Sequence, residues 1–544
     1  MILNPVDPRE EFFLIGIRER LAFAVIALVG AFFIIRLVTA PTYTDAYYHL
    51  NAANRFVTGQ GLTDPYLWTY IAAPDQLPVP SHLYWMPFTS LTAALGMVLW
   101  NAPQNYAAAQ FFLVLMLAGT IYIGFYLGER LGQSRRHAWS VGLLTLFSGY
   151  FARFWGAIDT FTPFAFVGAL ALLFLGFSVD ESLPRRRWLI WIILSGVFAA
   201  LAHLTRADGV LFLLVGWSVL IWSLLFHHQS SFKDRLFRCL VGILVMTFAY
   251  LLTMTPWFIR NINLVGSPLP VGGTQTIWFT SYDDIFNYPP DSSPATLFAN
   301  GLTDFLASRW LALTNNLGTF IAVEGLIVMT PLMLIGLWRR RHQSFLRPFW
   351  IYALGMHLAM TFVFPFPGYR GGLFHSAAAL VPWWAALGIL GLDDVIEWVS
   401  KRRRRWNART AKRFFSGALV LIALALTFAL NMASPRASSA PTTLYQILKD
   451  QLPADARLMV NDPAQLYYFT GFQGVVLPNE EPDVIPEIAN RYGVRYLLLE
   501  QVSDDGTVSG AATSKLWSIL TSPPDFLLPI PLPLSDVRLY EILD

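Results

Sequence analysis

Two isolated carboxylates are the residues best suited to chemistry in this chain. Asp45 and His49 stand four residues apart in the segment DAYYH, so a helix that begins after Pro41 would place both on one face. Asp159 lies in ARFWGAIDTFTPF, between two apolar runs. Such groups, held close to a bilayer, can act as a general base or bind a divalent cation. Both aspartates also have a structural interpretation, because either could cap a helix.

Three arginines could supply the complementary positive charge. Arg206 lies in HLTRADG, Arg260 in PWFIRN and Arg370 in FPGYRGG, each at the end of an apolar run. A guanidinium group binds phosphate through two parallel hydrogen bonds and always stays charged. We therefore expect at least one of the three to hold a phosphate, although their spacing does not single one out. Ion pairing, such as Arg206 with Asp208, or contact with lipid headgroups is the structural alternative.

Composition defines the class of protein. The chain has 544 residues, of which 55% are hydrophobic and 13% charged, and its mean hydropathy is +0.48. These values exclude a soluble protein and indicate a polytopic α-helical membrane protein. A single cysteine, Cys239, excludes an intrachain disulfide framework. The net charge of +3 gives no sign of nucleic-acid binding, and no nucleotide-binding loop or zinc spacing is present.

Apolar runs predict about eleven transmembrane helices, because about 20 residues are needed to cross a bilayer. The runs cover residues 21–40, 106–127, 138–153, 161–178, 188–203, 210–226, 236–258, 317–337, 349–364, 373–396 and 414–431. A further run, 83–100, is expected to lie at the interface or to re-enter the membrane. Counting it as a span would invert the charge pattern of every later gap.

Charge alternates from gap to gap. Lys and Arg cluster in every second gap, at residues 9–20, 130–136, 185–187, 233–238, 339–347 and 401–413. Gaps rich in Lys and Arg remain cytoplasmic. We therefore expect a cytoplasmic N-terminus, and external positions for the lone acids, for a first loop over 41–105 and for a long loop over 259–314. Aromatic residues of the first loop, Trp68 and Trp85 among them, could form an interfacial girdle or stack on carbohydrate.

The composition changes again after residue 433. Helix patterns at 444–452 and 485–492 alternate with strand patterns at 457–460, 495–500 and 537–542. This alternation predicts a membrane module over 1–433 and a small extracytoplasmic α/β domain over 434–544. We expect that domain to guide the acceptor without an acid or base role. Three lone histidines near span ends are interpreted as packing residues: His82, His203 and His375.

Several motifs resemble those of GT-C superfamily membrane glycosyltransferases. DAYYH, DPYL and SHLYWMP are similar to the first external loop of oligosaccharyltransferase catalytic subunits and their archaeal relatives. LTRADG, PWFIRNINLVGSPLP, NDPAQLYYFTG and YGVRYLLLE resemble bacterial enzymes of the aminoarabinose-transferase and protein mannosyltransferase type. The WWDYG acceptor motif of oligosaccharyltransferases is missing, since the only tandem tryptophans, Trp383 and Trp384, lie inside an apolar run.

The resemblance implies an inverting hexosyl or pentosyl transferase of the cell envelope that uses a polyprenyl-phosphate-linked sugar donor. It implies that Asp45 is the catalytic base or a metal ligand and that Asp159 is its partner. A Mg²⁺ or Mn²⁺ ion, if used, would be shared by Asp45, Asp159 and His49. The donor phosphate would meet Arg206, Arg260 or Arg370, and the acceptor would be a glycan, a lipid or a protein.

Other functions remain open at this point. An oligosaccharyltransferase would use a lipid-diphosphate donor and an asparagine acceptor. A lipid-linked-sugar flippase or transporter would use broken helices and charges at the bilayer midplane. A scaffold without activity is the third alternative.

Overall fold

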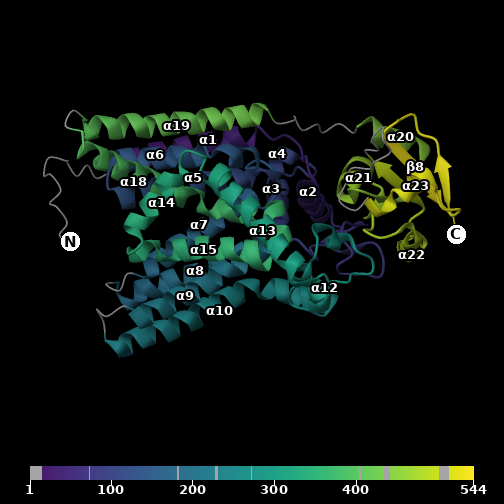
Figure 1. Ribbon diagram of the computed structural model, residues 1–544, viewed down its shortest axis with the longest axis horizontal. Helices are drawn as coiled ribbons and strands as arrows, with labels where there is room; N and C mark the ends of the chain where they lie inside the picture. The colour runs from purple at the N-terminus through teal and green to yellow at the C-terminus, as the bar shows by residue number, and fades with distance from the viewer. Residues whose placement is uncertain are drawn as a thin grey trace.

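Long helices lie side by side in a bundle, and a small α/β unit lies at one end of it (Figure 1). The computed structural model describes residues 15–72, 74–179, 183–226, 231–270, 272–403, 406–433, 442–500 and 514–543. Three arginines of the predicted basic gaps, Arg9, Arg404 and Arg405, lie outside these ranges.

Seven helical segments of the described chain are long and apolar enough to cross a membrane. They are Tyr106–Gly132 (α4 Tyr106–Ala109 and α5 Phe111–Gly132), Phe161–Ser178 (α7), Arg185–Thr205 (α8), Ala207–Phe226 (ending in α9, Leu211–Phe226), Phe232–Val265 (α10), Pro365–Ser400 (α16 Pro365–Pro367, α17 Leu373–Ala377 and α18 Val381–Ser400) and Ala408–Met432 (α19). The chain is therefore a polytopic helical membrane protein, and the total of eleven spans stays a prediction.

The other four expected spans correspond to helices outside this group. α1 (Ile17–Ile35) begins with the charged residues Arg18, Glu19 and Arg20, α6 (Arg135–Leu146) and α15 (Arg347–Leu358) are shorter, and α13 and α14 (Gly301–Thr319 and Thr330–Arg340) are separated by an interruption. The bounds 317–337 were wrong, because α13 begins inside the expected external loop. A break over 320–329, where Leu326 and Ile327 have positive φ, then separates α13 from α14.

Contacts bring the basic gaps together at one end of the bundle. Arg20 pairs with Glu129 (Nη2 to Oε1, 2.6 Å), which joins the first gap to the second. Arg136 of the second gap and Lys412 of the last gap share the Asp393 carboxylate, and Arg340 of the gap at 339–347 pairs with the adjacent Asp394 (Nη1 to Oδ2, 2.6 Å). Four of the six basic gaps therefore meet at one end of the bundle.

The loop over 41–105, which the charge pattern predicts to be external and which is called the first external loop below, folds over the opposite end of the bundle. It contains α2 (Thr44–Val57), β1 (Thr63–Asp64), β2 (Tyr66–Leu67), β3 (Val79–Pro80) and α3 (Phe88–Leu99). At 12 residues, α3 is about 18 Å long and too short to cross a core of roughly 30 Å. The long loop after α10 forms α11 (Gly272–Gln275), a short turn of helix η4 (Tyr282–Phe286) and α12 (Pro294–Ala299).

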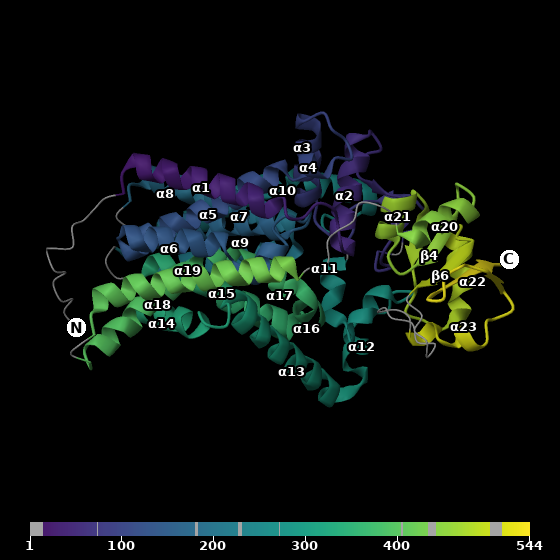
Figure 2. The same ribbon diagram turned by 90° about the horizontal axis from the view of Figure 1, so that it is seen from above.

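The C-terminal unit is built on a six-stranded sheet with the order β2-β5-β4-β6-β8-β7. Its own elements are α20 (Thr443–Gln451), β4 (Arg457–Val460), α21 (Pro463–Thr470), β5 (Gln473–Val476), α22 (Ile485–Tyr492), β6 (Tyr496–Glu500), α23 (Ser518–Thr521), β7 (Leu527–Ile530) and β8 (Val537–Ile542). The edge strand β2 belongs to the first external loop and pairs in parallel with β5, Tyr66 opposite Gly474. Backbone hydrogen bonds therefore join this unit to the loop that carries Asp45. Figure 2 shows α2 of that loop beside α21 of the unit.

Candidate active site

A cavity of about 500 Å³ lies where the membrane helices, the first external loop and the C-terminal unit meet. Its lining includes Asp45, Trp85, Arg206, Arg370, His375 and Asn461. The cavity therefore brings together three predicted site residues (Asp45, Arg206 and Arg370), one histidine that was interpreted as a packing residue (His375), and a residue of the C-terminal unit (Asn461).

Asp45 lies in the first turn of α2, where the positive end of the helix dipole faces it. Tyr43 precedes the helix in an extended conformation and turns the chain out of the first membrane helix. The pKa of Asp45 is raised to about 8. Burial in the cavity wall is the main cause, the nearby Asp159 carboxylate acts in the same direction, and Arg206 opposes the shift. Asp45 makes no ion pair within the part of the chain that the structure describes.

Asp159 is fully buried in the short connection before α7. Its Oδ2 accepts a hydrogen bond from the Tyr43 hydroxyl (2.8 Å), and its Oδ1 accepts one from the backbone N–H of Thr160 (2.5 Å). Burial raises the pKa of Asp159, and these hydrogen bonds oppose that shift. The carboxylate is therefore held in a fixed orientation by Tyr43, which follows the first membrane helix, and by Thr160, which precedes α7.

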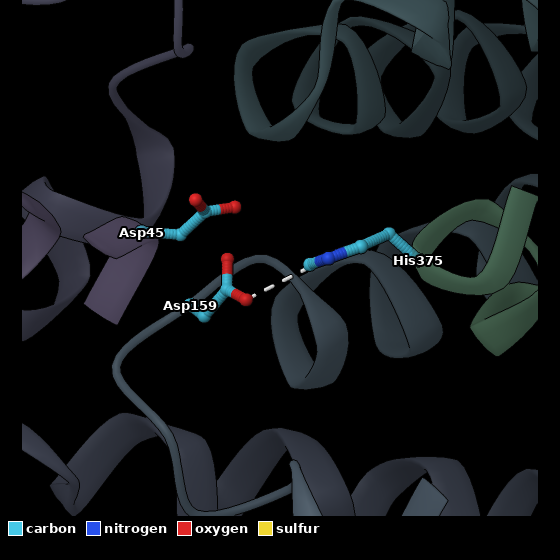
Figure 3. Close-up of side chains that lie close together, drawn as sticks. All are labelled: Asp45, Asp159 and His375. Carbon is cyan, nitrogen blue, oxygen red and sulfur yellow. Dashed lines mark ion pairs between the residues drawn. The ribbon is translucent and has the colours of Figure 1, made fainter. Parts of the chain in front are cut away.

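His375 completes a group of three with the two aspartates (Figure 3). It comes from α17, and its Nδ1 lies 3.6 Å from Asp159 Oδ2 and 2.9 Å from the Thr160 hydroxyl. One ligand atom from each of Asp45, Asp159 and His375 lies within 4.8 Å of the other two. Two carboxylates and an imidazole suit a divalent cation such as Mn²⁺ or Zn²⁺, and a cation would offset the burial of two acids.

The structure does not bring His49 to this group. His49 is fully buried inside the first external loop, where its Nδ1 lies 2.8 Å from the Ser90 hydroxyl. Ser90 in turn meets His82 Nε2 at 2.9 Å. The spacing of Asp45 and His49 did place them on one side of α2, but His49 faces the packing of the loop and does not line the cavity.

Arg206 lines the cavity and is held firmly. Its Nε donates to Asp208 Oδ1 (2.9 Å), its Nη1 to the Thr160 hydroxyl (3.4 Å) and its Nη2 to the Gly372 carbonyl (3.4 Å). The predicted pairing with Asp208 is therefore present, and Asp208 also accepts a hydrogen bond from Ser376. The contact with Thr160 places the guanidinium group beside the Asp159 connection.

The other two arginines differ in position. Arg370 lines the cavity, with its guanidinium carbon 4.7 Å from the centre of the Tyr282 ring. Arg260 does not line it. Arg260 Nη2 donates to the carbonyls of Leu62 (3.0 Å) and Ser81 (2.9 Å), so it fastens the end of α10 to the first external loop.

Sequence reasoning missed His375 and Asp462. His375 had been interpreted as a packing residue, and 215 residues separate it from Thr160, so no spacing could join it to the Asp159 connection. Asp462 caps α21 and accepts a hydrogen bond from the Thr44 hydroxyl (Oδ2, 2.7 Å), which comes from the residue before Asp45. The motif NDPAQLYYFTG, whose second residue is Asp462, was the only signal for it.

A bundle of apolar helices with external acids and an α/β unit at the same end is the architecture of the GT-C membrane glycosyltransferases. No protein-family model and no curated sequence matches the chain, whereas solved structures of this fold do. Archaeoglobus fulgidus oligosaccharyltransferase AglB, with an inhibitory peptide and a dolichol-phosphate, has a TM-score of 0.57 at 13% identity over 88% of this chain and 69% of AglB.

Two further solved structures are similar to this chain in fold. ArnT from Cupriavidus metallidurans, bound to undecaprenyl phosphate, has a TM-score of 0.56 at 13% identity and covers 96% of this chain and 97% of its own. The Archaeoglobus fulgidus oligosaccharyltransferase in complex with Zn and sulfate has a TM-score of 0.58 at 12% identity, over 95% and 72% of the two chains. The chain therefore has the GT-C fold over nearly its whole length.

Proposed function

We propose that the protein is an integral-membrane glycosyltransferase that moves a sugar from a polyprenyl-phosphate-linked donor to an acceptor hydroxyl at the external membrane face. One observation carries the proposal: Asp45 and two arginines, Arg206 and Arg370, line a single cavity, and the buried Asp159 lies directly behind its wall, with a carboxylate oxygen within 4.8 Å of one of Asp45. The lipid phosphates bound to AglB and ArnT support the choice of donor.

In the proposed reaction, Asp45 acts as the base. The acceptor oxygen attacks the anomeric carbon from the side opposite the lipid phosphate, and the acceptor proton passes to the Asp45 carboxylate. The bond from the anomeric carbon to the phosphate oxygen breaks, and its electrons remain on the phosphate. The products are an inverted glycoside and a polyprenyl phosphate. Because phosphate is a good leaving group, the reaction needs a base more than it needs a general acid.

Arg206 and Arg370 are the groups proposed to hold the departing phosphate. Guanidinium groups stabilise the charge that develops there, and a wall that excludes water strengthens the effect. Arg206 is already oriented by Asp208 and Thr160, so little reorganisation is needed when the phosphate binds. Arg260, whose guanidinium group binds loop carbonyls, is not proposed for this role.

Asp45, Asp159 and His375 are the residues that would hold a divalent cation. Such an ion would supply positive charge near the acceptor oxygen and the phosphate when bound. Apolar residues of the membrane helices, including Met360 and Phe364, line the same cavity and suit the first isoprene units of the donor. Asp159 and Thr160 keep their hydrogen bonds in this arrangement and fix the site.

The function can be tested with purified protein in liposomes that contain a labelled undecaprenyl-phosphate sugar. Asp45→Asn should lower transfer by at least about 100-fold, because it removes the base. Asp75→Asn makes the same change at an exposed position of the same loop and should leave transfer intact. Equal activity of the two variants contradicts the proposal. Transfer from a diphosphate donor to an asparagine peptide would indicate an oligosaccharyltransferase, and movement of the lipid without cleavage would indicate a flippase.

Sidedness needs its own experiment, because the proposal requires the cavity to open away from the cytosol. Cys239 is buried, so the natural chain offers little background to a membrane-impermeant maleimide. In intact cells Asp75→Cys should be labelled and Arg186→Cys should not. Labelling of both positions, or of Arg186→Cys alone, contradicts a cytoplasmic N-terminus and an external C-terminal unit.

A further inference from the structure

Three aromatic rings of the first external loop form a ladder. The rings of Trp85 and Trp68 are stacked, with centres 3.9 Å apart and an interplanar angle of 25°, and the ring of Tyr48 lies against Trp85 with centres 4.3 Å apart and a tilt of 39°. Tyr84 meets the edges of both tryptophans, at 4.9 Å from Trp68 and 5.7 Å from Trp85. The rings therefore fix one another, and none can turn without disturbing the others.

The ladder runs from the interior of the loop to the cavity. Tyr48 is almost fully buried, and its hydroxyl donates to Asp64 Oδ2 (2.8 Å), which anchors the inner end. Trp85 is covered by Tyr48 on one side and by Trp68 on the other. Trp68, Tyr84 and Trp85 line the cavity, and within the described chain no further ring stacks face to face on Trp68. The ladder therefore ends on Trp68.

The position of the ladder does not fit a membrane girdle. Aromatic anchors at a bilayer surface expose their rings to lipid headgroups. Trp100, at the end of α3, is 61% exposed, and Trp310 of α13 is 68% exposed, as such anchors are. Trp68 and Trp85 are instead half-buried in the wall of an internal cavity. A ligand in that cavity is the partner that their position suits.

The ladder lies on the side of the cavity that the C-terminal unit covers. Trp68 directly follows β2, which pairs with β5 of that unit. Asn461, Pro463 and Val476 of the same unit line the cavity as well. The membrane helices supply the apolar and cationic part of the lining. A substrate group that meets Trp68 therefore comes from the aqueous side, while the lipid-linked donor comes from the membrane.

We propose that Trp68 stacks on a sugar ring of the acceptor, so that the acceptor is a glycan or the sugar headgroup of a glycolipid. The C–H groups on one face of a pyranose ring form a flat apolar surface that packs on an indole ring, and its hydroxyl groups remain free for Asp45. A peptide acceptor has no comparable need for a fixed planar platform. The inference rests on the proposed function and narrows it, because that function leaves the acceptor open.

The test measures binding and so does not depend on catalysis. Purified protein in nanodiscs is mixed with methyl β-D-glucopyranoside, methyl β-D-galactopyranoside or methyl α-D-mannopyranoside, and saturation-transfer NMR detects contact with ring protons. At least one glycoside should bind, and Trp68→Leu should weaken its binding roughly tenfold. Trp68→Phe, which keeps an aromatic face, should retain most of the affinity. Trp100→Leu is the matched control and should change nothing.

Each outcome decides the proposal. The proposal is overturned if no glycoside binds, or if a glycoside binds Trp68→Leu as well as it binds the natural protein. It is also overturned if the peptide Ac-Asn-Ala-Thr-NH₂ binds and the glycosides do not. Size-exclusion profiles of the variants show whether a loss comes from misfolding. If glycosides bind through Trp68 while Asp45→Asn leaves transfer unchanged, the proposed reaction fails and the carbohydrate site remains.

Discussion

Two clusters of buried charged residues lie at opposite ends of the same bundle, and they are built differently. At the basic end, the Asp393 carboxylate contacts Arg136, His137 (Nε2, 3.0 Å) and Lys412 (Nζ, 3.7 Å). At the other end, Asp45 and Asp159 lie beside a cavity, and the single ion-pair contact that the described residues give them is from His375 to Asp159, at 3.6 Å.

The difference separates a structural cluster from a chemical one. The carboxylate at the basic end, on α18, is matched by positively charged side chains from α6 and α19, which holds these three helices together. At the cavity, the nearest arginine, Arg206, is paired with Asp208, so the two aspartates lack a matching charge. An uncompensated pair of buried acids is costly and is expected where a ligand or a cation will offset it.

The largest effect on stability should come from the basic end. Asp393→Asn removes the carboxylate that Arg136, His137 and Lys412 share, and we expect the free energy of unfolding to fall by about 3–5 kcal/mol. Thermal unfolding in detergent measures the loss. Transfer per folded molecule should stay unchanged. Glu397→Gln, at a side chain 53% exposed, is the control and should cost under about 1 kcal/mol. If Asp393→Asn lowers transfer by folded protein, the separation of roles is wrong.

Arg206→Ala should have the opposite effect to Asp393→Asn: a large loss of transfer activity with a smaller loss of stability. It removes the cation proposed to meet the phosphate, so kcat/KM should fall about 100- to 1000-fold, equivalent to about 2.7–4 kcal/mol. Arg206→Lys keeps the charge but loses the planar guanidinium group, so its kcat/KM should lie between those of the natural protein and Arg206→Ala. Donor binding and initial rates in liposomes measure both variants. A melting temperature that drops as far as in Asp393→Asn would mean that Arg206 is structural.

Arg260→Ala separates the two candidate roles of that residue. Loss of its bonds to the Leu62 and Ser81 carbonyls should lower the free energy of unfolding by about 1–3 kcal/mol, because the buried Ser81 carbonyl loses its partner, whereas the Leu62 carbonyl keeps the backbone N–H of Ser81. The KM for the donor should stay near that of the natural protein. A large rise in donor KM without a loss of stability would restore Arg260 as a phosphate ligand.

Local rules predicted which residues would lie close together. The alternation of basic gaps predicted one end of the bundle for Asp45 and Asp159, and the two carboxylates do lie together. Arg206 and Arg370 line the cavity beside them, and the roles of all four residues stay predictions. In the C-terminal unit, the predicted strand 537–542 and helix 485–492 have the bounds of β8 and α22. Each of these follows from a pattern within one short segment.

Features that depend on distant contacts could not be predicted in this way. The Thr44 hydroxyl and Asp462 are 418 residues apart in sequence, and a two-residue strand such as β2 has no pattern of its own. His375 acquires its position from the packing of α17 against α7. The bounds of α13 were missed because the helix starts in a polar segment and is interrupted at Leu326 and Ile327, where the backbone leaves the helical region.

The pH dependence of transfer tests the same difference between the two ends of the bundle, and it is the smallest of the expected effects. A base must be deprotonated, and the pKa of Asp45 is raised to about 8, chiefly by burial and then by Asp159. Without added divalent cation, kcat/KM should therefore fall about tenfold, or about 1.4 kcal/mol, for each pH unit below 8. Added Mn²⁺ should move the midpoint to lower pH, because the ion binds the carboxylate form.

Asp462→Asn should also lower that midpoint, since the neighbouring Asp462 carboxylate raises the pKa of Asp45. Asp75→Asn, far from the cavity, is the control and should leave the midpoint in place. The measurement is the rate of transfer between pH 6 and pH 9 at fixed donor concentration. A flat profile over that range would mean that the titration of Asp45 does not limit the reaction. The carboxylates at the two ends of the bundle would then no longer differ in the way that their contacts imply.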